Sequence, residues 1–240
     1  MRKVDNNIWV VEIEFRFSGT DFGNRMTVIR LPSGKLVLHS PVAFSYELLQ
    51  EMNKIGEVGF IITPNNFHGL YADQWCEEFP QARYYSALKK DTGGAEDLSV
   101  LMSEAQKDME SAIEVIKIDG ISKLNEYVFF HKESATLVLT DLAFNFNESI
   151  SFWSKVFFKL NGCYNKFSPS RLMKSLIDSP DELSHSIEHI LTLEFDRIIV
   201  SHGDLVEVNA REKFDSAFSK EKIDVSRKKA GFKLNLSNCG

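Results

Sequence analysis

The first forty residues alternate apolar and polar positions with a period of two. The segment "NIWVVEIEFRF" (7–17) shows this pattern, "RMTVIRL" (25–31) follows, and "LPSGKLVLHSP" (31–41) places a Pro-Ser-Gly turn between two apolar runs. A period of two sends alternate side chains to opposite faces of a strand. The pattern therefore predicts an N-terminal group of β-strands that includes a hairpin.

The rest of the chain mixes short apolar runs with segments of helical spacing. Leu48, Leu49 and Met52 lie near the period of a helix, and Gly56 marks its end. The run "EVGFIITP" (57–64) is almost continuously apolar, which is typical of a strand that is buried on both faces. Further strand-like runs are 82–88, 111–120, 126–133, 135–144 and 196–204, and further helical segments are 68–80, 151–162, 168–177, 179–195 and 208–218.

These elements follow one another without an internal repeat or a linker long enough to separate two domains. The clearest loop is "KKDTGGAEDLS" (89–99), which is rich in charge and glycine. Strands, then helices, then strands again, with a late strand between helices, predict a layered α/β (α+β) architecture with helices outside the sheets. We expect one domain over residues 1–240.

The net charge of the chain argues against some classes of binding partner. The 240 residues carry a formal net charge of −6, so no net positive field attracts nucleic acid or an anionic membrane. The densest basic cluster, Arg227 to Lys229, is assigned to a solvated tail. No apolar run reaches the roughly 18 residues of a membrane span, and the first residues lack the apolar core of a signal peptide. We expect a cytoplasmic protein with a small-molecule ligand or substrate, and the oligomeric state stays open.

The cysteines also favour a reducing compartment. Cys76, Cys163 and Cys239 are widely spaced and odd in number. Such a set fits reduced thiols better than a disulfide framework, and no pair of them has the spacing of metal ligands.

Four ionisable residues lie at the same kind of place, the end of an apolar strand. They are His39, His68, Asp141 and His202. Strand ends gather at one edge of an open α/β sheet, and imidazoles with a carboxylate form a ligand set that a divalent ion prefers. The sequence therefore predicts a shared site, against the alternative that each is only a hydrogen-bonded turn residue.

Four segments together indicate a family. They are "RMTVIRLPSGKLVLHSPV", "PNNFHGLYADQW", "FFHKESATLVLTDLAFN" and "DRIIVSHGD", within roughly residues 5 to 215. Through these segments the chain resembles the metallo-β-lactamase-fold superfamily, and more specifically an uncharacterised, domain-of-unknown-function branch of it. The resemblance implies an αββα sandwich with its site along one sheet edge.

The resemblance also implies that much of the superfamily's metal motif is lost. The motif Thr-His-x-His-x-Asp-His, laid on "IITPNNFH" with its last histidine at His68, places Thr63 and Asn65 at the two upstream histidines and Phe67 at the aspartate. The further histidine of the first metal site is missing near "KIDGISK" (117–123). All three imidazoles of that first site are therefore absent.

Three ligands of the superfamily's second metal site are matched, by His68, Asp141 and His202. This set implies one zinc or iron ion with an open fourth position, and an active protein would be a metal-dependent hydrolase of an ester, lactone or thioester. The alternative is a metal-free binding or regulatory protein that keeps the fold without catalysis. The missing ligands favour this alternative, whereas three matched residues at strand ends favour the hydrolase, which is the preferred interpretation.

Several neighbours are candidates for supporting this site. His39 is assigned the role of a ligand or of a hydrogen-bond partner to one, or equally the capping of the turn before Pro41. Asn65 or Asn66 is expected to orient a water, and Asp204, two residues after His202, to hold the other nitrogen of that imidazole. His131, on a strand, is expected either to hydrogen-bond a ligand from behind or to lie in the core.

Two further patterns are given structural interpretations. "HSIEH" (185–189) has the inverted zincin spacing, but both histidines fall opposite the apolar side of their helix and are expected to face water. Ser40 and Ser201 each precede or follow a histidine, yet adjacent residues on a strand point to opposite faces, so adjacency makes no triad. The apolar segment "SFWSKVFFKL" (151–160) is predicted to be core, with an interface as the alternative.

Overall fold

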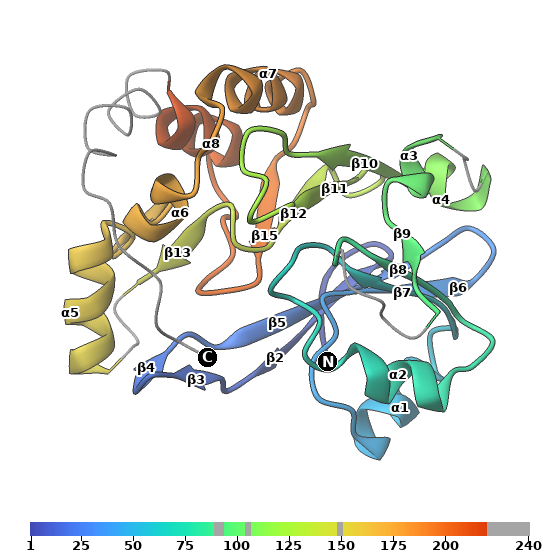
Figure 1. Ribbon diagram of the computed structural model, residues 1–240. Helices are drawn as coiled ribbons and strands as arrows, with labels where there is room; N and C mark the ends of the chain where they lie inside the picture. Colours follow the sequence, from blue (N-terminus) through green and yellow to red (C-terminus); the bar gives the residue numbers. More distant parts are fainter. Residues whose placement is uncertain (89–93, 104–106, 148–150, 220–240) are drawn as a thin grey trace.

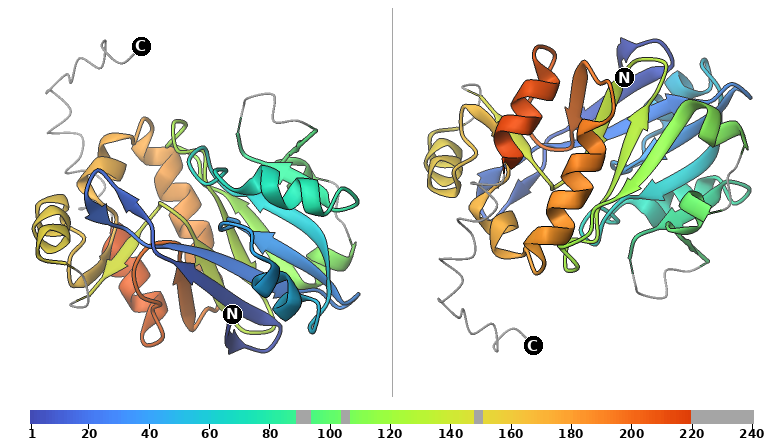
Figure 2. Two further views of the ribbon diagram at one scale, coloured as in Figure 1. Left: turned by 90° about the horizontal axis from the view of Figure 1, so that it is seen from below. Right: turned by 90° about the horizontal axis from the view of Figure 1, so that it is seen from above.

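Two β-sheets face each other and helices cover their outer sides (Figures 1 and 2). This description rests on a computed structural model, which describes residues 1–88, 94–103, 107–147 and 151–219. Cys239 and the basic cluster Arg227 to Lys229 lie outside these residues.

The first sheet has the strand order β1-β2-β5-β6-β7-β8-β9. Neighbours from β1 to β6 are antiparallel, and those from β6 to β9 are parallel. The predicted hairpin joins β5 to β6, and Gly34 supplies the positive φ of 86° in its turn. The strands are β1 (Arg2–Asp5), β2 (Ile8–Ile13), β5 (Asn24–Arg30), β6 (Lys35–His39), β7 (Glu57–Thr63), β8 (Arg83–Ser86) and β9 (Glu96–Asp97).

The second sheet has the order β10-β11-β12-β15, formed by β10 (Ile113–Lys117), β11 (Tyr127–His131), β12 (Thr136–Leu139) and β15 (Arg197–Val200). Its last two strands are parallel, with Leu139 opposite Val200. Because parallel strands end at the same edge, the residues that follow β12 and β15 emerge side by side. Two short pairs complete the strands: β3 (Arg16–Phe17) with β4 (Thr20–Asp21), and β13 (Phe144–Phe146) with β14 (Lys166–Ser168).

The helices form the two outer layers. On the first sheet, Met52 of α1 and Trp75 of α2 pack against Leu36 and Leu38 of β6. On the second sheet, α7 and α8 pack in the same way. None of the helices in the described ranges is long and apolar enough to cross a bilayer. They are α1 (Tyr46–Met52), α2 (Ala72–Glu78), α3 (Val100–Ser103), α4 (Lys107–Ala112), α5 (Phe152–Asn161), α6 (Arg171–Ser175), α7 (Pro180–Leu191) and α8 (Ala210–Phe218).

The middle layer is an apolar core between the sheets. Val37 and Ile62 of the first sheet meet Phe129, Val138 and Ile199 of the second. Side chains of alternate residues along β6 therefore serve different layers, as the period of two requires. The predicted α/β layering is confirmed, and strands from both halves of the chain build this core. One domain over residues 1–240 stays a prediction.

Some elements differ from the sequence prediction. The run 7–17 does not form one strand, because the carbonyl of Phe15 accepts the N–H groups of Phe22 and Gly23 and breaks the ladder. The strand β14 was not predicted. The expected loop 89–99 includes β9, and its residues 89–93 lie outside the described part of the chain.

The prediction that residues 151–160 form core is wrong for most of that segment. Helix α5 begins at the N-cap Ser151 and ends at Gly162 in the left-handed conformation. It buries Ser154 and Phe158, whereas Phe152 and Trp153 are 70% and 74% exposed. The helix lies at one end of the molecule, where the body can cover one stripe of its surface and no more (Figures 1 and 2).

Candidate metal centre

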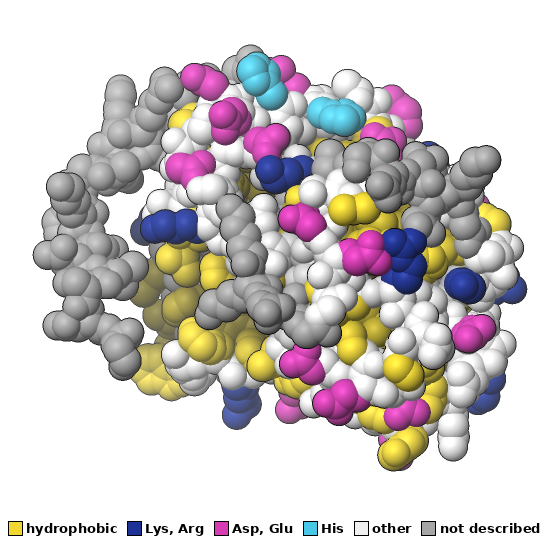
Figure 3. Space-filling view, turned by 45° about the vertical axis from the view of Figure 1, so that its right-hand side comes forward, with side chains coloured by type: hydrophobic (Ala, Val, Ile, Leu, Met, Phe, Trp, Pro, Cys, Tyr) yellow, Lys and Arg dark blue, Asp and Glu magenta, His cyan; other side chains and the backbone are white. Residues whose placement is uncertain are grey.

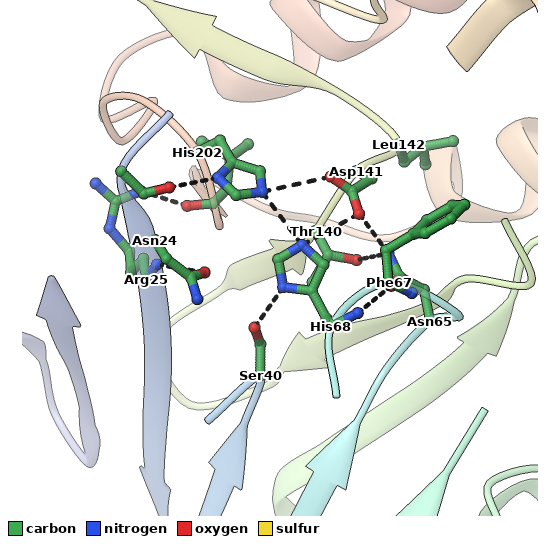
Figure 4. A network of polar contacts seen from close by, with 12 residues as sticks. Asn24, Arg25, Ser40, Asn65, Phe67, His68, Thr140, Asp141, Leu142 and His202 are labelled. Carbon is green, nitrogen blue, oxygen red and sulfur yellow. Dashed lines mark hydrogen bonds and ion pairs between the residues drawn. The ribbon is translucent and has the colours of Figure 1, made fainter. Parts of the chain in front are cut away.

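Three of the four strand-end residues come together in space. His68 follows β7, Asp141 follows β12 and His202 follows β15, and one ligand atom from each lies within 4.8 Å of the others (Figure 4). Asp141 and His202 each stand two residues beyond the paired positions Leu139 and Val200. Parallel pairing thus places them together, and β7 of the opposite sheet supplies His68 across the layer. Within the described ranges this is the one group of its kind.

The carboxylate of Asp141 lies between the two imidazoles. Its Oδ2 is 3.1 Å from Nε2 of His68, and its Oδ1 is 3.4 Å from Nε2 of His202. The two Nε2 atoms are 3.2 Å apart. Both histidines are buried, and the Asp141 side chain keeps 18% of its surface exposed. Access to the centre is therefore from the Asp141 side.

Hydrogen bonds at Nδ1, on the side of the ring away from Asp141, orient the two imidazoles. Nδ1 of His202 lies 2.7 Å from the carbonyl oxygen of Gly23, which can only accept, so this nitrogen carries the proton. In the neutral ring the lone pair is then on Nε2 and faces the centre. Nδ1 of His68 lies 2.7 Å from Oγ of Ser40, a hydroxyl that can donate or accept, so this contact orients the ring in either tautomer. Such outer hydrogen bonds are what orient histidine ligands in metal sites.

Charge inside the cluster changes two pKa values in opposite directions. Burial acts to lower the pKa of His68, but the neighbouring Asp141 carboxylate outweighs it and the pKa is raised. Burial acts to raise the pKa of Asp141, and the two histidines lower it well below its usual range. The Asp141 carboxylate therefore stays ionised and attracts a positive charge, which is either a proton on a histidine or a metal ion.

Asn65 connects two of the three strand ends. Its Oδ1 accepts the N–H groups of Phe67 and His68 at 2.8 and 3.0 Å. Its Nδ2 lies 2.9 Å from both Oγ1 of Thr140 and Oδ2 of Asp141. The amide is completely buried, and its hydrogen bonds fix the Asp141 carboxylate relative to the turn after β7. The expectation that Asn65 orients a water is replaced by this direct role.

Glu126 is a site residue that sequence reasoning missed. Its carboxylate is fully buried and accepts the backbone N–H groups of Thr140, Asp141 and Leu142 at 2.8 to 3.0 Å. Asn65 donates a further bond at 3.2 Å. Burial raises the pKa of Glu126, and the charge of Asp141 raises it further. The one available signal was an acidic residue directly before the apolar strand "YVFFH".

Arg25 is a second residue that was missed, and it holds the other side of the centre. Its guanidinium is buried, donates to the carbonyl oxygens of Val200 and Gly203, and pairs with Glu12 at 2.6 Å. These carbonyls flank His202 on the turn after β15. Arg25 therefore fixes that turn, although in the sequence it is only the first residue of an alternating strand.

His39 does not join the other three strand ends. It points between the sheets, its ring packs edge-on against Phe129 at 4.7 Å, and its Nε2 has no hydrogen-bond partner among the described residues. Burial lowers its pKa to about 3, with a smaller contribution from His68. The alternation along β6 turns His39 to the same face as Val37, which is the apolar layer.

A His39→Leu substitution tests this placement. Replacing a buried, unpartnered nitrogen by an apolar side chain removes a desolvation penalty, so we expect the free energy of unfolding to rise by about 1 kcal/mol. Metal binding should be unchanged, as measured by titration during chemical denaturation. A loss of metal binding in this variant would restore His39 as a ligand.

The structure also shows where the two other candidate supporting residues, Asp204 and His131, lie. The prediction that Asp204 holds His202 is wrong: Gly23 occupies that nitrogen, and Asp204 is exposed and accepts from Asn147 at 2.6 Å. Gly203, with φ of 88° between them, turns the chain away. His131 belongs to the core, where Nδ1 lies 2.7 Å from Oγ of Ser134.

The zincin-like pair lies elsewhere on the surface. His185 and His189 are exposed on α7, as expected from the apolar periodicity, and histidine side chains are visible on the outer surface there (Figure 3). Ser40, by contrast, is buried and contacts His68, which is distant in sequence, rather than the adjacent His39. A fully buried hydroxyl cannot reach a substrate, so Ser40 orients the imidazole.

A cavity of about 530 Å³ opens beside His202. Ser201 and Gly203 form part of its wall, and Phe22 and Phe146 line its apolar side. Phe22 also contacts the His202 ring, with centroids 5.9 Å apart. The volume is in the range of small-molecule sites.

The charge pattern predicts how the metal-free protein responds to pH. Asp141, whose pKa is lowered, contributes stability that is present above about pH 4 and is lost as the pH falls through the folded value. His68, whose pKa is raised, contributes stability that is present below about pH 6.5 and is lost as the pH rises through the folded value. The pair should therefore stabilise most between these limits.

Chemical denaturation in chelator at about pH 6 and about pH 8.5 checks this expectation. The wild type should lose more stability between the two values than His68→Gln, which lacks the titrating group. Parallel pH profiles for the two proteins would contradict the coupling of His68 to Asp141.

Comparison with known proteins agrees with this architecture. The model of a family described as a domain of unknown function (DUF4336) matches residues 5–91. No curated protein matches the chain in sequence. Among solved structures, it is similar to a metallo-β-lactamase from Pontibacter korlensis, with 11% identity over 90% of this chain and 96% of that chain and a TM-score of 0.56.

Two further metallo-β-lactamases give the same picture. FIM-1 from Pseudomonas aeruginosa, in its mono-zinc form, is 10% identical over 94% of each chain with a TM-score of 0.58. DIM-1 is 14% identical over 92% of this chain and 96% of that chain with a TM-score of 0.56. The chain thus has a metallo-β-lactamase-like fold, and the predicted αββα sandwich is confirmed.

Proposed function

We propose that the protein is a divergent metallo-hydrolase that holds a single zinc or iron ion with His68, Asp141 and His202. The observation that carries this proposal is the spacing of the donor atoms. Two ligands about 2.1 Å from a tetrahedral ion lie about 3.4 Å from each other. Nε2 of His68 is 3.1 Å from Oδ2 of Asp141, Nε2 of His202 is 3.4 Å from Oδ1, and the two Nε2 atoms are 3.2 Å apart, so each pair of side chains is already near the spacing of two ligands of one ion.

The donor chemistry supports the same assignment. The Nε2 atoms of two buried histidines and a carboxylate face one another, and a metal ion there would take the place of the proton that Asp141 now favours on His68. Three protein ligands leave a fourth position, which is the arrangement of catalytic rather than structural zinc sites. When bound, such an ion acidifies water and polarises a carbonyl group, which is the chemistry needed to hydrolyse an ester, lactone or thioester.

The surrounding residues would act by positioning. Ser40 and the carbonyl of Gly23 hold the two imidazoles by their outer nitrogens. Asn65 and Glu126 hold the turn that presents Asp141. The cavity beside His202 offers a small molecule an apolar wall at Phe22 and Phe146. Asp141, whose side chain keeps 18% of its surface exposed, marks the side from which a substrate would reach the ion.

FIM-1 from Pseudomonas aeruginosa, a similar structure, is described in a mono-zinc form. We propose by analogy that one ion suffices here. The competing proposal, from another class, is a metal-free binding or regulatory protein. It is favoured by Asn65, whose amide is consumed by hydrogen bonds where the superfamily motif has a histidine, and by Phe67, which is 60% exposed at the aspartate position.

Metal analysis of protein purified without chelator or a histidine tag separates the two proposals. The metallo-hydrolase proposal expects close to one zinc or iron per chain, lost in His68→Ala, together with hydrolysis of at least one member of a panel of esters, lactones and thioesters. A wild type that contains no metal and gains no stability from added zinc, iron or manganese would overturn it. In that outcome the binding-protein proposal stands.

A further inference from the structure

Helix α5 presents large apolar side chains to solvent. Phe152, Trp153 and Leu160 are 70%, 74% and 65% exposed. At about 100° per residue, the buried Ser154 and Phe158 lie opposite the side that carries them. The outward side of this helix is therefore apolar, which reverses the usual arrangement of a surface helix.

The apolar surface extends beyond the helix. Phe17 of the β3–β4 hairpin is 63% exposed and Leu172 of α6 is 65% exposed. Phe17 joins α5 through Phe22, whose ring lies 6.5 Å from Phe17 and 5.7 Å from Phe157. We call the surface formed by Phe17, Phe152, Trp153, Phe157, Leu160 and Leu172 the aromatic face. Exposed apolar groups gathered in one place mark an interaction site.

The same part of the chain is basic. From residue 151 to residue 177 the sequence has no aspartate or glutamate, and its basic residues are Lys155, Lys159, Lys166, Arg171 and Lys174. The whole chain nevertheless has a formal net charge of −6. The expectation that a membrane is not a partner rested on that total, which conceals a segment with five positive charges beside an apolar surface.

We propose that the aromatic face binds the surface of an anionic phospholipid bilayer. Phenylalanine, tryptophan and leucine flanked by lysine is the composition of helices that lie in a membrane interface. The cations would meet lipid phosphates while the negatively charged remainder is repelled, which orients the molecule with α5 toward the bilayer. A second copy of the chain fits less well, because a two-fold contact would bring Lys155 and Lys159 against like charges.

Flotation of the full chain with vesicles tests the proposal and needs no metal or substrate, so its result is independent of the proposed function. We expect binding to vesicles of phosphatidylcholine with about 30% phosphatidylserine, weaker binding to phosphatidylcholine alone, and a decrease as salt is raised. No binding of the wild type to the anionic vesicles at low salt would overturn the proposal.

Variants locate the binding surface. Lys155→Gln with Lys159→Gln should weaken binding about 25-fold, since each basic residue near an anionic surface contributes about fivefold. Phe152→Ser with Trp153→Ser should weaken it at least about tenfold. The matched control is Tyr46→Ser, which removes a side chain that is 69% exposed on α1 at the far end of the molecule (Figure 1).

Equal denaturation midpoints would show that the variants are folded, which the exposure of their side chains favours. Trp153→Phe supplies a site-specific readout: it should still bind, but without the blue shift in fluorescence that Trp153 gives on entering the interface. Unchanged binding in both double variants would overturn the proposal. So would a wild-type dimer that the Phe152→Ser, Trp153→Ser variant dissociates, because the face would then belong to a second copy.

Discussion

Asp141→Asn is expected to abolish stabilisation of the fold by zinc. With free zinc at about 100 times the dissociation constant, the wild type should gain about 2.7 kcal/mol in its free energy of unfolding. Asparagine preserves the shape of the side chain but removes the charge that lies 3.1 and 3.4 Å from the two imidazoles. A neutral amide is a poor zinc ligand, so the variant should gain nothing measurable. Urea denaturation with and without zinc gives both numbers.

Asp204→Asn is the matched control for that experiment. This carboxylate lies two residues beyond His202 but is exposed and bonds to Asn147. Its loss should leave zinc stabilisation within about 0.5 kcal/mol of the wild type. Zinc stabilisation of Asp141→Asn as large as that of the wild type would exclude Asp141 as a ligand.

Glu126→Ala should be among the most destabilising single substitutions in the protein. It would leave the backbone N–H groups of Thr140, Asp141 and Leu142 without their acceptor in a buried place. Each unsatisfied buried donor costs about 1 to 3 kcal/mol, so the three together predict a loss of at least about 3 kcal/mol. Chemical denaturation in chelator measures the loss without the contribution of a metal.

Glu126→Gln refines the same test. One of its two terminal atoms becomes a donor that faces another donor, so a loss of about 1 to 2 kcal/mol is expected, with metal affinity reduced about 10- to 100-fold through misplaced Asp141. Glu133→Gln, an exposed carboxylate on the β11–β12 turn, is the control and should change stability by less than about 0.5 kcal/mol. A Glu126→Gln protein as stable as the wild type would contradict the positioning role.

Much of the fold could be predicted because its signals are local. The alternation in residues 25–41 and the turn at Pro32 to Gly34 are enough to specify the β5–β6 hairpin. The apolar run 57–64 specifies β7 as a buried strand. Strands shorter than four residues, such as β14, carry too few positions for a period to show.

The candidate site was predicted in part, for a reason that concerns topology. His68, Asp141 and His202 were named because each ends an apolar strand, and parallel pairing brings two of those ends together. His39 ends a strand as well, but the alternation along β6 turns it into the core between the sheets. The position of a residue at the end of an apolar run thus predicted that it lies at the edge of the sheet. The alternation of side chains along the strand decided whether that residue points to the metal centre or into the core.

The sequence by itself determined most of the longer strands and helices and the identity of the ionisable groups at the strand ends, because propensity, period and turn chemistry act over a few neighbouring residues. Only the tertiary structure decided that Glu126 and Arg25 are buried supports and that α5 carries its aromatic residues outward. Burial depends on what packs against a side chain from distant parts of the chain. A charged residue next to a strand and an apolar residue on a helix look alike in sequence whether they are covered or exposed.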